Sequence, residues 1–193
     1  MKNNKITYAL FFVAAVIAQW FVPMQIIYQQ EDILSTGKMF KFKTAPVDPY
    51  DAFRGKYIYL NYDQTTISVP NLKKYNSNDE IFVLLKDSAG YALVTSISKT
   101  KPKSGDYFKA KIGWVDQLSS KNLISIDYPF NRFYMNEYKA KPAETVYADS
   151  NRNPNTTTYA LIAVKEGEAV VKDVLINEIS IKILAKKERN KEK

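Results

Sequence analysis

The sequence predicts a mainly β protein, in which an N-terminal transmembrane helix precedes one extracytoplasmic antiparallel β-sheet domain. Three observations predict this class. Residues 6–28 contain no charged side chain, later segments alternate apolar and polar residues with period two, and Gly, Pro, Asn and Asp interrupt those segments at short intervals. We expect the domain to be sandwich- or barrel-like, with a short helix near residues 142–150.

The composition divides the chain into four segments. These are a basic start at residues 1–5, a transmembrane signal anchor at 6–28, a β-rich domain at 29–185 and a basic flexible tail at 186–193. A helix that spans the hydrocarbon core needs about 20 predominantly apolar residues. Lys2 and Lys5 favour a cytoplasmic N-terminus, and Trp20 and Tyr28 suit the far interface.

The apolar run has two other interpretations. Val16-Ile17-Ala18 would pass as a signal-peptide cleavage site, but the apolar run continues ten residues past Ala18, so we favour an uncleaved anchor. A buried core helix is disfavoured because little of the downstream sequence is helical enough to pack around one. The domain is therefore expected outside the cytoplasm, on the periplasmic side of the inner (cytoplasmic) membrane.

Seven segments predict the strands of the domain. Each is rich in β-branched or aromatic residues and is bounded by turn-forming residues. We expect hairpin turns at 87–90 and 166–167. The segments are 38–45, 56–63, 80–97, 105–115, 122–128, 156–176 and 178–184.

Helix signals occur at two places. Pro142-Ala143-Glu144 supplies a proline and an acid where a helix begins. Asp48 and Pro49 suit the N-cap and first position of a single helical turn over 49–54, which Gly55 ends with a positive φ. A strand then starts at Lys56 and places Ile58, Leu60 and Tyr62 on its buried face, with Lys56 at the mouth of that face.

Missing residue types exclude several kinds of site. The chain has no cysteine and no histidine, which removes the disulfide framework, the thiolate nucleophile and the commonest general base and transition-metal ligand. The net charge of +8 falls to +3 for residues 29–185 once the basic ends are set apart. We therefore expect no nucleic-acid partner, no cofactor and no metal.

The segment FRGKYIYLNY, residues 53–62, resembles the defining motif of the GDYXXLXY family, bacterial proteins with an N-terminal membrane segment. Gly55, Tyr57, Leu60 and Tyr62 match its fixed positions, whereas Lys56 replaces the motif's aspartate. NRFYMNE, Glu144 and the final hairpin are also similar to the family. The residues expected to form the motif and a docking surface are Asp48, Arg54, Gly55, Lys56, Tyr57, Leu60, Tyr62, Arg132, Tyr134, Glu137 and Glu144.

The resemblance implies an accessory subunit, because members of that family tend to be encoded beside or fused to multi-span membrane proteins. We therefore favour a binding or assembly module that docks on an integral membrane protein, with its oligomeric state left open. Within the motif we expect Arg54 to pair with Glu137. Tyrosine is enriched where protein surfaces meet, but ordinary packing on a sheet also accounts for these tyrosines and is the favoured interpretation of the rings taken alone.

Two alternatives use other residues. A sugar or cation could bind carboxylates of Asp48, Asp51, Glu137 and Glu144. A hydrolase of the signal-peptidase type could use Ser35 with Lys56 or Lys101 as base. The serine lacks the Ser-x-Met-x-Pro context of those enzymes, so we expect no catalytic residue in this chain.

Overall fold

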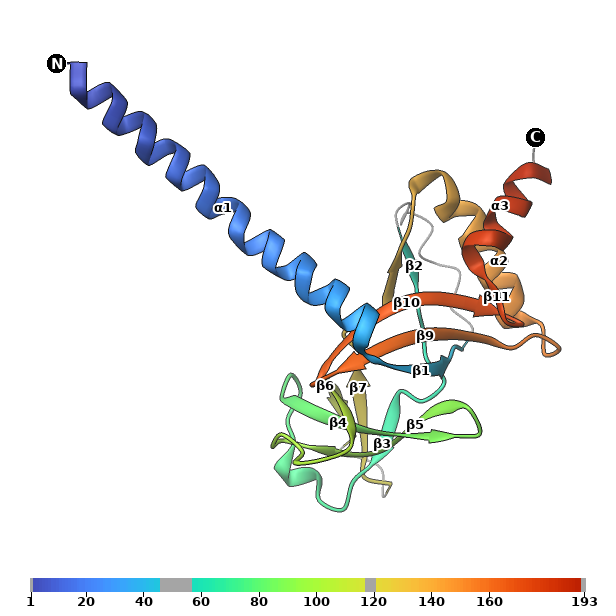
Figure 1. Cartoon of the computed structure of the whole chain (residues 1–193). Coiled ribbons are helices and arrows are strands. Elements are labelled where there is room, and N and C mark those ends of the chain that lie inside the picture. Colours follow the sequence, from blue (N-terminus) through green and yellow to red (C-terminus); the bar gives the residue numbers. More distant parts are fainter. Residues whose placement is uncertain (1, 46–56, 117–120, 192–193) are drawn as a thin grey trace.

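The computed structural model describes residues 2–45, 57–116 and 121–191. Its first element is one long helix, α1 (Lys2–Thr36), which extends away from the remainder of the chain (Figure 1). The stretch Lys5–Thr36 is long and apolar enough to cross a membrane, and none of its most apolar window is buried against the domain. The prediction of a helix outside the protein core is therefore confirmed.

Within the described residues, the strands form three antiparallel sheets. The first has the order β1-β9-β10-β11, with β1 (Lys38–Lys43), β9 (Thr158–Lys165), β10 (Glu168–Ile176) and β11 (Ile179–Ser180). The second has the order β3-β7-β6-β4-β5, with β3 (Thr66–Ser68), β7 (Leu123–Asp127), β6 (Asp106–Val115), β4 (Glu80–Ser88) and β5 (Tyr91–Ser98). The third is a ribbon of β2 (Tyr57–Tyr59) and β8 (Arg132–Tyr134).

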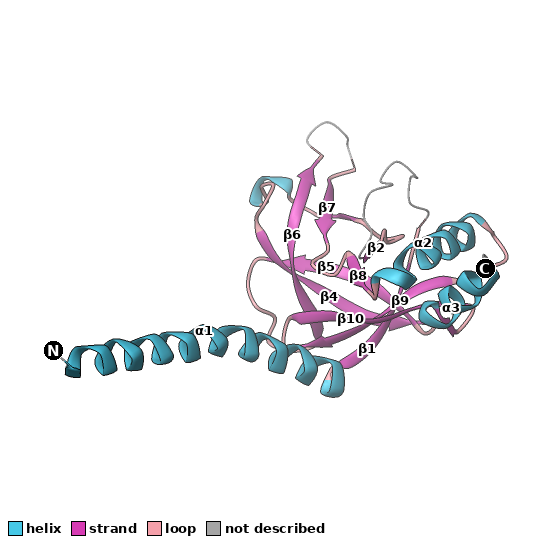
Figure 2. Ribbon diagram, turned by 90° about the horizontal axis from the view of Figure 1, so that it is seen from above, coloured by secondary structure: helices cyan, strands magenta, loops and turns pink. Residues whose placement is uncertain are grey.

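The two larger sheets meet at the turn between β9 and β10. There Gly167 forms a bridge with Phe108, and its carbonyl accepts a hydrogen bond of 2.7 Å from the amide of Lys109 on β6. The sheets thus enclose much of a barrel. In the described part of the chain, no ladder joins β1 to β5, one edge strand from each sheet. A mainly β, barrel-like domain is confirmed (Figure 2).

A side chain occupies the edge of β5. Gln64 accepts a hydrogen bond of 2.9 Å from the amide of Val94 and donates one of 3.0 Å to the carbonyl of the same residue. The primary amide thereby replaces one residue of a neighbouring strand.

Aromatic rings dominate the core between the sheets. Phe42 of β1 contacts four rings edge-on at centroid distances of 5.3–6.1 Å, which suits aromatic pairs. These rings belong to Tyr62, Phe108, Tyr128 and Phe130. The core therefore joins segments that lie far apart in the sequence.

Both predicted hairpins are confirmed. Ala89 and Gly90 have φ values of 52° and 81° in the turn between β4 and β5, and Glu166 and Gly167 have φ values of 52° and 94° between β9 and β10. The amide of Gly90 also donates to Asp87 at 3.0 Å. The strand predicted at 56–63 is shorter than expected, since β2 spans only Tyr57–Tyr59. The sequence did not predict β3, β8 or the 3₁₀ helix η1 (Leu72–Lys74).

The helix predicted near 142–150 exists but begins earlier. It is α2 (Glu137–Arg152), whose N-cap is Asn136, with a side chain that accepts a hydrogen bond of 3.0 Å from the amide of Tyr138. Pro142 therefore lies inside the helix and is buried, instead of occupying the first position as predicted. An asparagine cap thus sets the start of the helix, and the proline packs against the core.

The strand predicted at 178–184 is wrong beyond Ser180. Helix α3 (Ile181–Lys191) begins at the next residue and packs beside α2 (Figure 1). Ile181 and Ala185 are buried four residues apart, which is helical spacing, whereas a strand would have buried alternate residues. The helix also runs through most of the segment from residue 186 that was expected to be a flexible tail.

Candidate functional site

The β2–β8 ribbon brings together two segments that the sequence singled out. Tyr57 pairs with Tyr134 and Tyr59 with Arg132, while Ile58 pairs with Phe133 between them. Ile58 and Phe133 are buried. Because neighbouring residues of a strand point to opposite faces, the other four side chains share the outward face. We call Tyr57, Tyr59, Arg132 and Tyr134 the tyrosine face.

Ring contacts hold the tyrosine face together. The rings of Tyr57 and Tyr134 lie 5.3 Å apart, and the guanidinium carbon of Arg132 lies 5.1 Å from the centre of the Tyr57 ring. The hydrogen bond with Tyr134, followed by the electrostatic effect of Tyr57, raises the pKa of Arg132, so the guanidinium stays charged. The result is a cation fixed against aromatic rings on a two-stranded ribbon.

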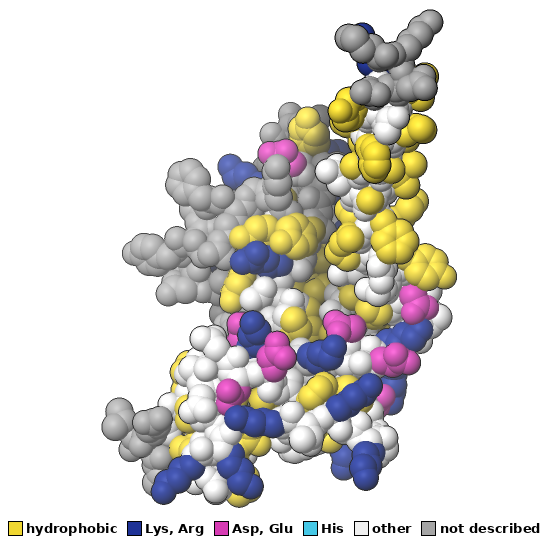
Figure 3. Space-filling view, turned by 90° about the vertical axis from the view of Figure 1, so that its left-hand side faces the viewer, with side chains coloured by type: hydrophobic (Ala, Val, Ile, Leu, Met, Phe, Trp, Pro, Cys, Tyr) yellow, Lys and Arg dark blue, Asp and Glu magenta, His cyan; other side chains and the backbone are white. Residues whose placement is uncertain are grey.

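Much of this face is open to solvent. Tyr134 is 64% exposed and Tyr59 38% exposed, and neighbouring Tyr138, in the first turn of α2, is 78% exposed. Large amphipathic rings that are held in place yet exposed are typical of surfaces that bind another molecule. Figure 3 shows hydrophobic side chains gathered on the face of the domain beside α1.

Two further motif residues, Leu60 and Tyr62, are buried in the domain next to the ribbon. Leu60 is 1% exposed, and its amide donates to the carbonyl of Asn131 at 2.8 Å. Tyr62 is buried, and its hydroxyl donates to the carbonyl of Phe130 at 2.7 Å. Burial raises the pKa of Tyr62 well above its ordinary value of 10.0, which keeps the hydroxyl neutral and able to donate. The predicted burial of Ile58, Leu60 and Tyr62 is confirmed.

Several predicted residues lie outside the described part of the chain. These are Asp48, Asp51, Arg54, Gly55 and Lys56. The helical turn at 49–54, the positive φ of Gly55 and the pairing of Arg54 with Glu137 therefore stay predictions.

The two other predicted carboxylates are both on α2. Glu137 occupies the first turn, where the helix dipole favours a negative charge, and Glu144 lies two turns later. Both side chains are exposed. Across residues 2–45, 57–116 and 121–191, no group of three or more Asp and Glu side chains is arranged to hold a metal ion. The described residues thus give the carboxylate site no support.

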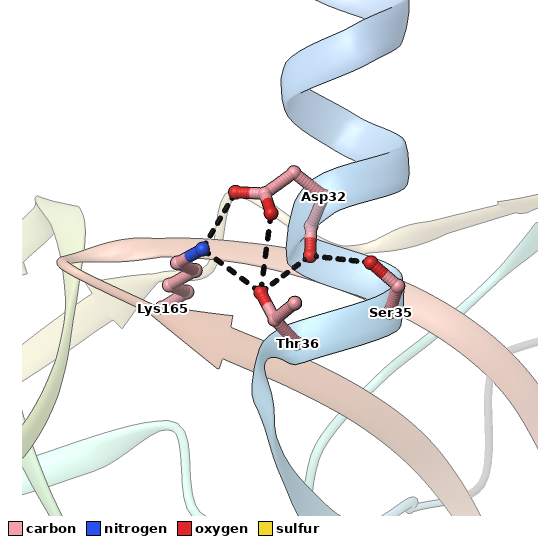
Figure 4. Close-up of polar contacts among 4 residues, drawn as sticks. All are labelled: Asp32, Ser35, Thr36 and Lys165. Carbon is pink, nitrogen blue, oxygen red and sulfur yellow. Dashed lines mark hydrogen bonds and ion pairs between the residues drawn. The ribbon is translucent and has the colours of Figure 1, made fainter.

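A polar cluster fastens the end of α1 to the domain, and Figure 4 shows its contacts. The ammonium of Lys165 donates to the Asp32 carboxylate at 2.6 Å and to the Thr36 hydroxyl at 2.8 Å. The hydrogen bond from Lys165 lowers the pKa of Asp32 and so keeps this carboxylate charged. The side chain of Ile33, one turn before Gly37, is buried.

Gly37 completes this connection. Its amide donates to the Ile33 carbonyl at 2.8 Å, and an added Cβ would lie only 2.4 Å from that oxygen and 3.3 Å from the backbone of Val164. We call Asp32, Thr36, Gly37 and Lys165 the joint. Asp32 and Thr36 are four positions apart in the sequence, a spacing that places two side chains on the same face of a helix. Nothing in the sequence indicated their partner on β9.

The joint does not reproduce a Ser/Lys catalytic pair. The hydroxyl of Ser35 donates to the carbonyl of Asp32 at 3.1 Å, while Lys165 contacts Asp32 and Thr36 instead (Figure 4). A lysine that acts as a base needs a lowered pKa, which burial away from carboxylates provides. Lys165 is paired with a carboxylate and Lys101 is exposed, so neither lysine is buried away from carboxylates.

A cleft of about 270 Å³ opens beside the motif residue Tyr62. Its aromatic wall includes Tyr62 and Tyr128, whose hydroxyls donate to the backbone carbonyls of Phe130 and Gln64. The hydrogen-bond donors of those hydroxyls are thus engaged by the backbone. The tyrosine face is therefore the stronger candidate site.

Comparison with known proteins gives one match. The model of a protein family described as GDYXXLXY protein matches residues 19–174. No curated protein and no solved structure matches the chain. The matched region includes the joint, the ribbon and the β-domain as far as Val174 within β10, whereas β11 and α3 follow it.

Proposed function

The chain belongs to the GDYXXLXY family, and we propose that it is a membrane-anchored binding module, an accessory subunit that docks on an integral membrane protein through its tyrosine face. The single observation that carries this proposal is the exposed, ring-stabilised face of the β2–β8 ribbon. A Tyr/Arg surface is the composition most often found at the energetic centre of protein interfaces.

Features of α1 support the anchoring. Its apolar residues are exposed in the isolated chain, and it is long enough to cross a bilayer. The basic residues before it favour an N-terminus in the cytoplasm. In this proposal the helix lies in the inner membrane and the β-domain lies in the periplasm.

The position of the tyrosine face supports a partner that is itself in the membrane. Figure 1 shows β2 between α1 and α2, at the end of the domain toward which α1 rises, and Figure 2 shows β8 next to β2. A surface there is close to the extracytoplasmic loops of a neighbouring multi-span protein. The cation of Arg132 suits a partner surface that offers carboxylates or backbone carbonyls.

The docking is tested by purifying the tagged full-length protein in mild detergent. The wild-type chain should carry a stoichiometric multi-span protein, and the double substitution Arg132→Ala with Tyr134→Ala should lose it. Trp114→Ala is the matched control, because Trp114 is an exposed aromatic residue on β6. A companion that survives the double substitution, or a wild-type chain that purifies alone, would contradict docking by this face.

The anchoring is tested separately. A C-terminal reporter that works only outside the cytoplasm should be active on the full-length chain, and the protein should stay in membranes after a carbonate wash. Release of a soluble protein that begins at Gln19 would show cleavage after Ala18 instead.

A further inference from the structure

We infer that the domain rests on the bilayer with the first turns of α2, so that Tyr138 and Lys141 lie among the phospholipid headgroups around α1. We call these two residues the α2 tip. The inference rests on the anchoring part of the proposed function and is independent of any protein partner.

The chain between membrane and domain is short. The apolar run ends at Tyr28, and residues 29–36 continue α1 to its last residue. Eight helical residues span roughly 12 Å, and the headgroup layer of one leaflet is roughly 5–8 Å thick. The domain therefore begins within a few ångströms of the headgroups.

One end of the domain closes the remaining gap. In Figure 1 the first turn of α2 lies at the top of the domain, on the side toward which α1 extends. The α2 tip is thus on the part of the domain that a membrane around α1 meets first.

The joint keeps this end turned toward the bilayer. Lys165 holds both Asp32 and Thr36, at 2.6 and 2.8 Å, and Ile33 is buried against the domain. The backbone of Gly37 packs so closely here that an added Cβ would lie 2.4 Å from the Ile33 carbonyl oxygen and 3.3 Å from the backbone of Val164. Because these contacts fix the helix to β9, the domain cannot swing freely below the membrane.

The chemistry of the α2 tip matches an interface. Tyr138 and Lys141 are three residues apart on one face of α2, and both are exposed. Tyrosine rings favour the headgroup level of a bilayer, and a lysine ammonium binds lipid phosphates from there.

The chain contains no cysteine, so single-cysteine variants allow the depth of one position to be measured. We propose to spin-label Tyr138→Cys and Lys141→Cys in the full-length protein and to insert it into nanodiscs of phosphatidylcholine with phosphatidylglycerol. Leu93→Cys on β5 is the control, because Leu93 is 43% exposed. Collisions with a water-soluble nickel complex should be several-fold rarer at positions 138 and 141 than at position 93.

The joint supplies a second arm. In the Lys165→Met variant, the collision rate of the label at position 138 with the nickel complex should rise toward that at position 93. Lys109→Met, which breaks the exposed pair with Glu168, should leave the collision rate at position 138 unchanged. Equal accessibility at positions 138, 141 and 93 in protein that stays in the discs would overturn the inference. Failure of the protein to enter the discs would instead contradict the anchoring.

Discussion

At the scale of single residues, Glu178 ties three elements together. Its carboxylate accepts a hydrogen bond of 2.6 Å from the Tyr159 hydroxyl on β9 and one of 3.0 Å from the Lys41 ammonium on β1. The Lys41 ammonium also lies 4.8 Å from the centre of the Tyr159 ring. The turn between β10 and β11 is thereby fastened to the sheet just before α3 begins.

This network predicts a measurable acid sensitivity. Tyr159 and then Lys41 lower the pKa of Glu178 below its ordinary value of 4.5. A lowered carboxyl pKa in the folded state contributes stability above the unfolded pKa, and this contribution is lost as the pH falls through the folded pKa. The thermal unfolding midpoint should therefore decline below about pH 4.5, and it should decline less steeply in Glu178→Gln.

The control for this prediction is Glu168→Gln. Glu168 pairs with Lys109 at 2.8 Å on an exposed surface, as Glu178 does with Lys41, and such pairs contribute little to stability. The control therefore isolates the additional hydrogen bond that Glu178 accepts from Tyr159. The pH profile of Glu168→Gln should run close to that of the wild-type protein. Parallel profiles for the wild-type protein and Glu178→Gln would contradict the role of this carboxylate.

Residue-scale predictions from the sequence succeeded where the pattern was local. The alternation of Ile58, Leu60 and Tyr62 identified their buried face correctly. The contact between Tyr57 and Tyr134, and that between Asp32 and Lys165 across 133 positions of the chain, depend on tertiary packing. No spacing rule in one sequence specifies which distant side chain completes such a pair.

At the scale of elements, α3 shows how one short pattern fits two structures. The segment EISIKIL alternates like a strand, but the residues after it are mostly strong helix formers. The structure buries Ile181 with Ala185 and leaves Ile179 and Ile183 at the surface. Helix propensity and packing against α2 therefore outweighed the alternation.

Two isoleucines of α3 test this assignment. Ile181→Ala should lower the free energy of unfolding by about 2–5 kcal/mol, because Ile181 is fully buried. Ile183 is the same residue type on the same helix but is 53% exposed, so Ile183→Ala should cost much less. Chemical denaturation of both variants checks this difference, and similar losses would favour the alternating strand over the helix.

At the scale of the whole molecule, Gly167 connects the two larger sheets. It has a φ of 94°, and an added Cβ would lie 3.0 Å from Cε2 of Tyr107 on β6. Its carbonyl also accepts the hydrogen bond from the Lys109 amide. A side chain at this position would therefore have two effects. It would strain the backbone of the turn, and it would push the turn away from β6 of the other sheet.

Gly90 provides a matched comparison for this connection. It has a similar φ of 81° in the other hairpin, and an added Cβ there would have nothing within 4 Å. Gly90→Ala should cost about 1–2 kcal/mol from backbone strain alone, and Gly167→Ala should cost more. Equal losses in denaturant unfolding would mean that the contact between the sheets carries no additional stability.

The sequence predicted most strands and both hairpins but not how the sheets are joined. Period-two alternation and the turn residues at 87–90 and 166–167 are local signals. The pairing of β2 with β8 and the bridge between Phe108 and Gly167 join segments more than fifty residues apart, and local patterns do not encode such register. The sequence consequently predicted Tyr57, Arg132 and Tyr134 as docking residues, but neither Tyr59 nor the strand pairing that places the four side chains on one face.

The side chain of Gln64 has a consequence for how neighbouring copies of the chain coexist. β5 ends its sheet, and the exposed peptide groups of an edge strand offer pairing sites to any other extended chain. Copies confined to one bilayer would meet edge to edge far more often than copies dissolved in three dimensions. Because Gln64 already occupies the peptide N–H and C=O of Val94, those two groups near the middle of β5 are not available to a strand from a neighbouring copy.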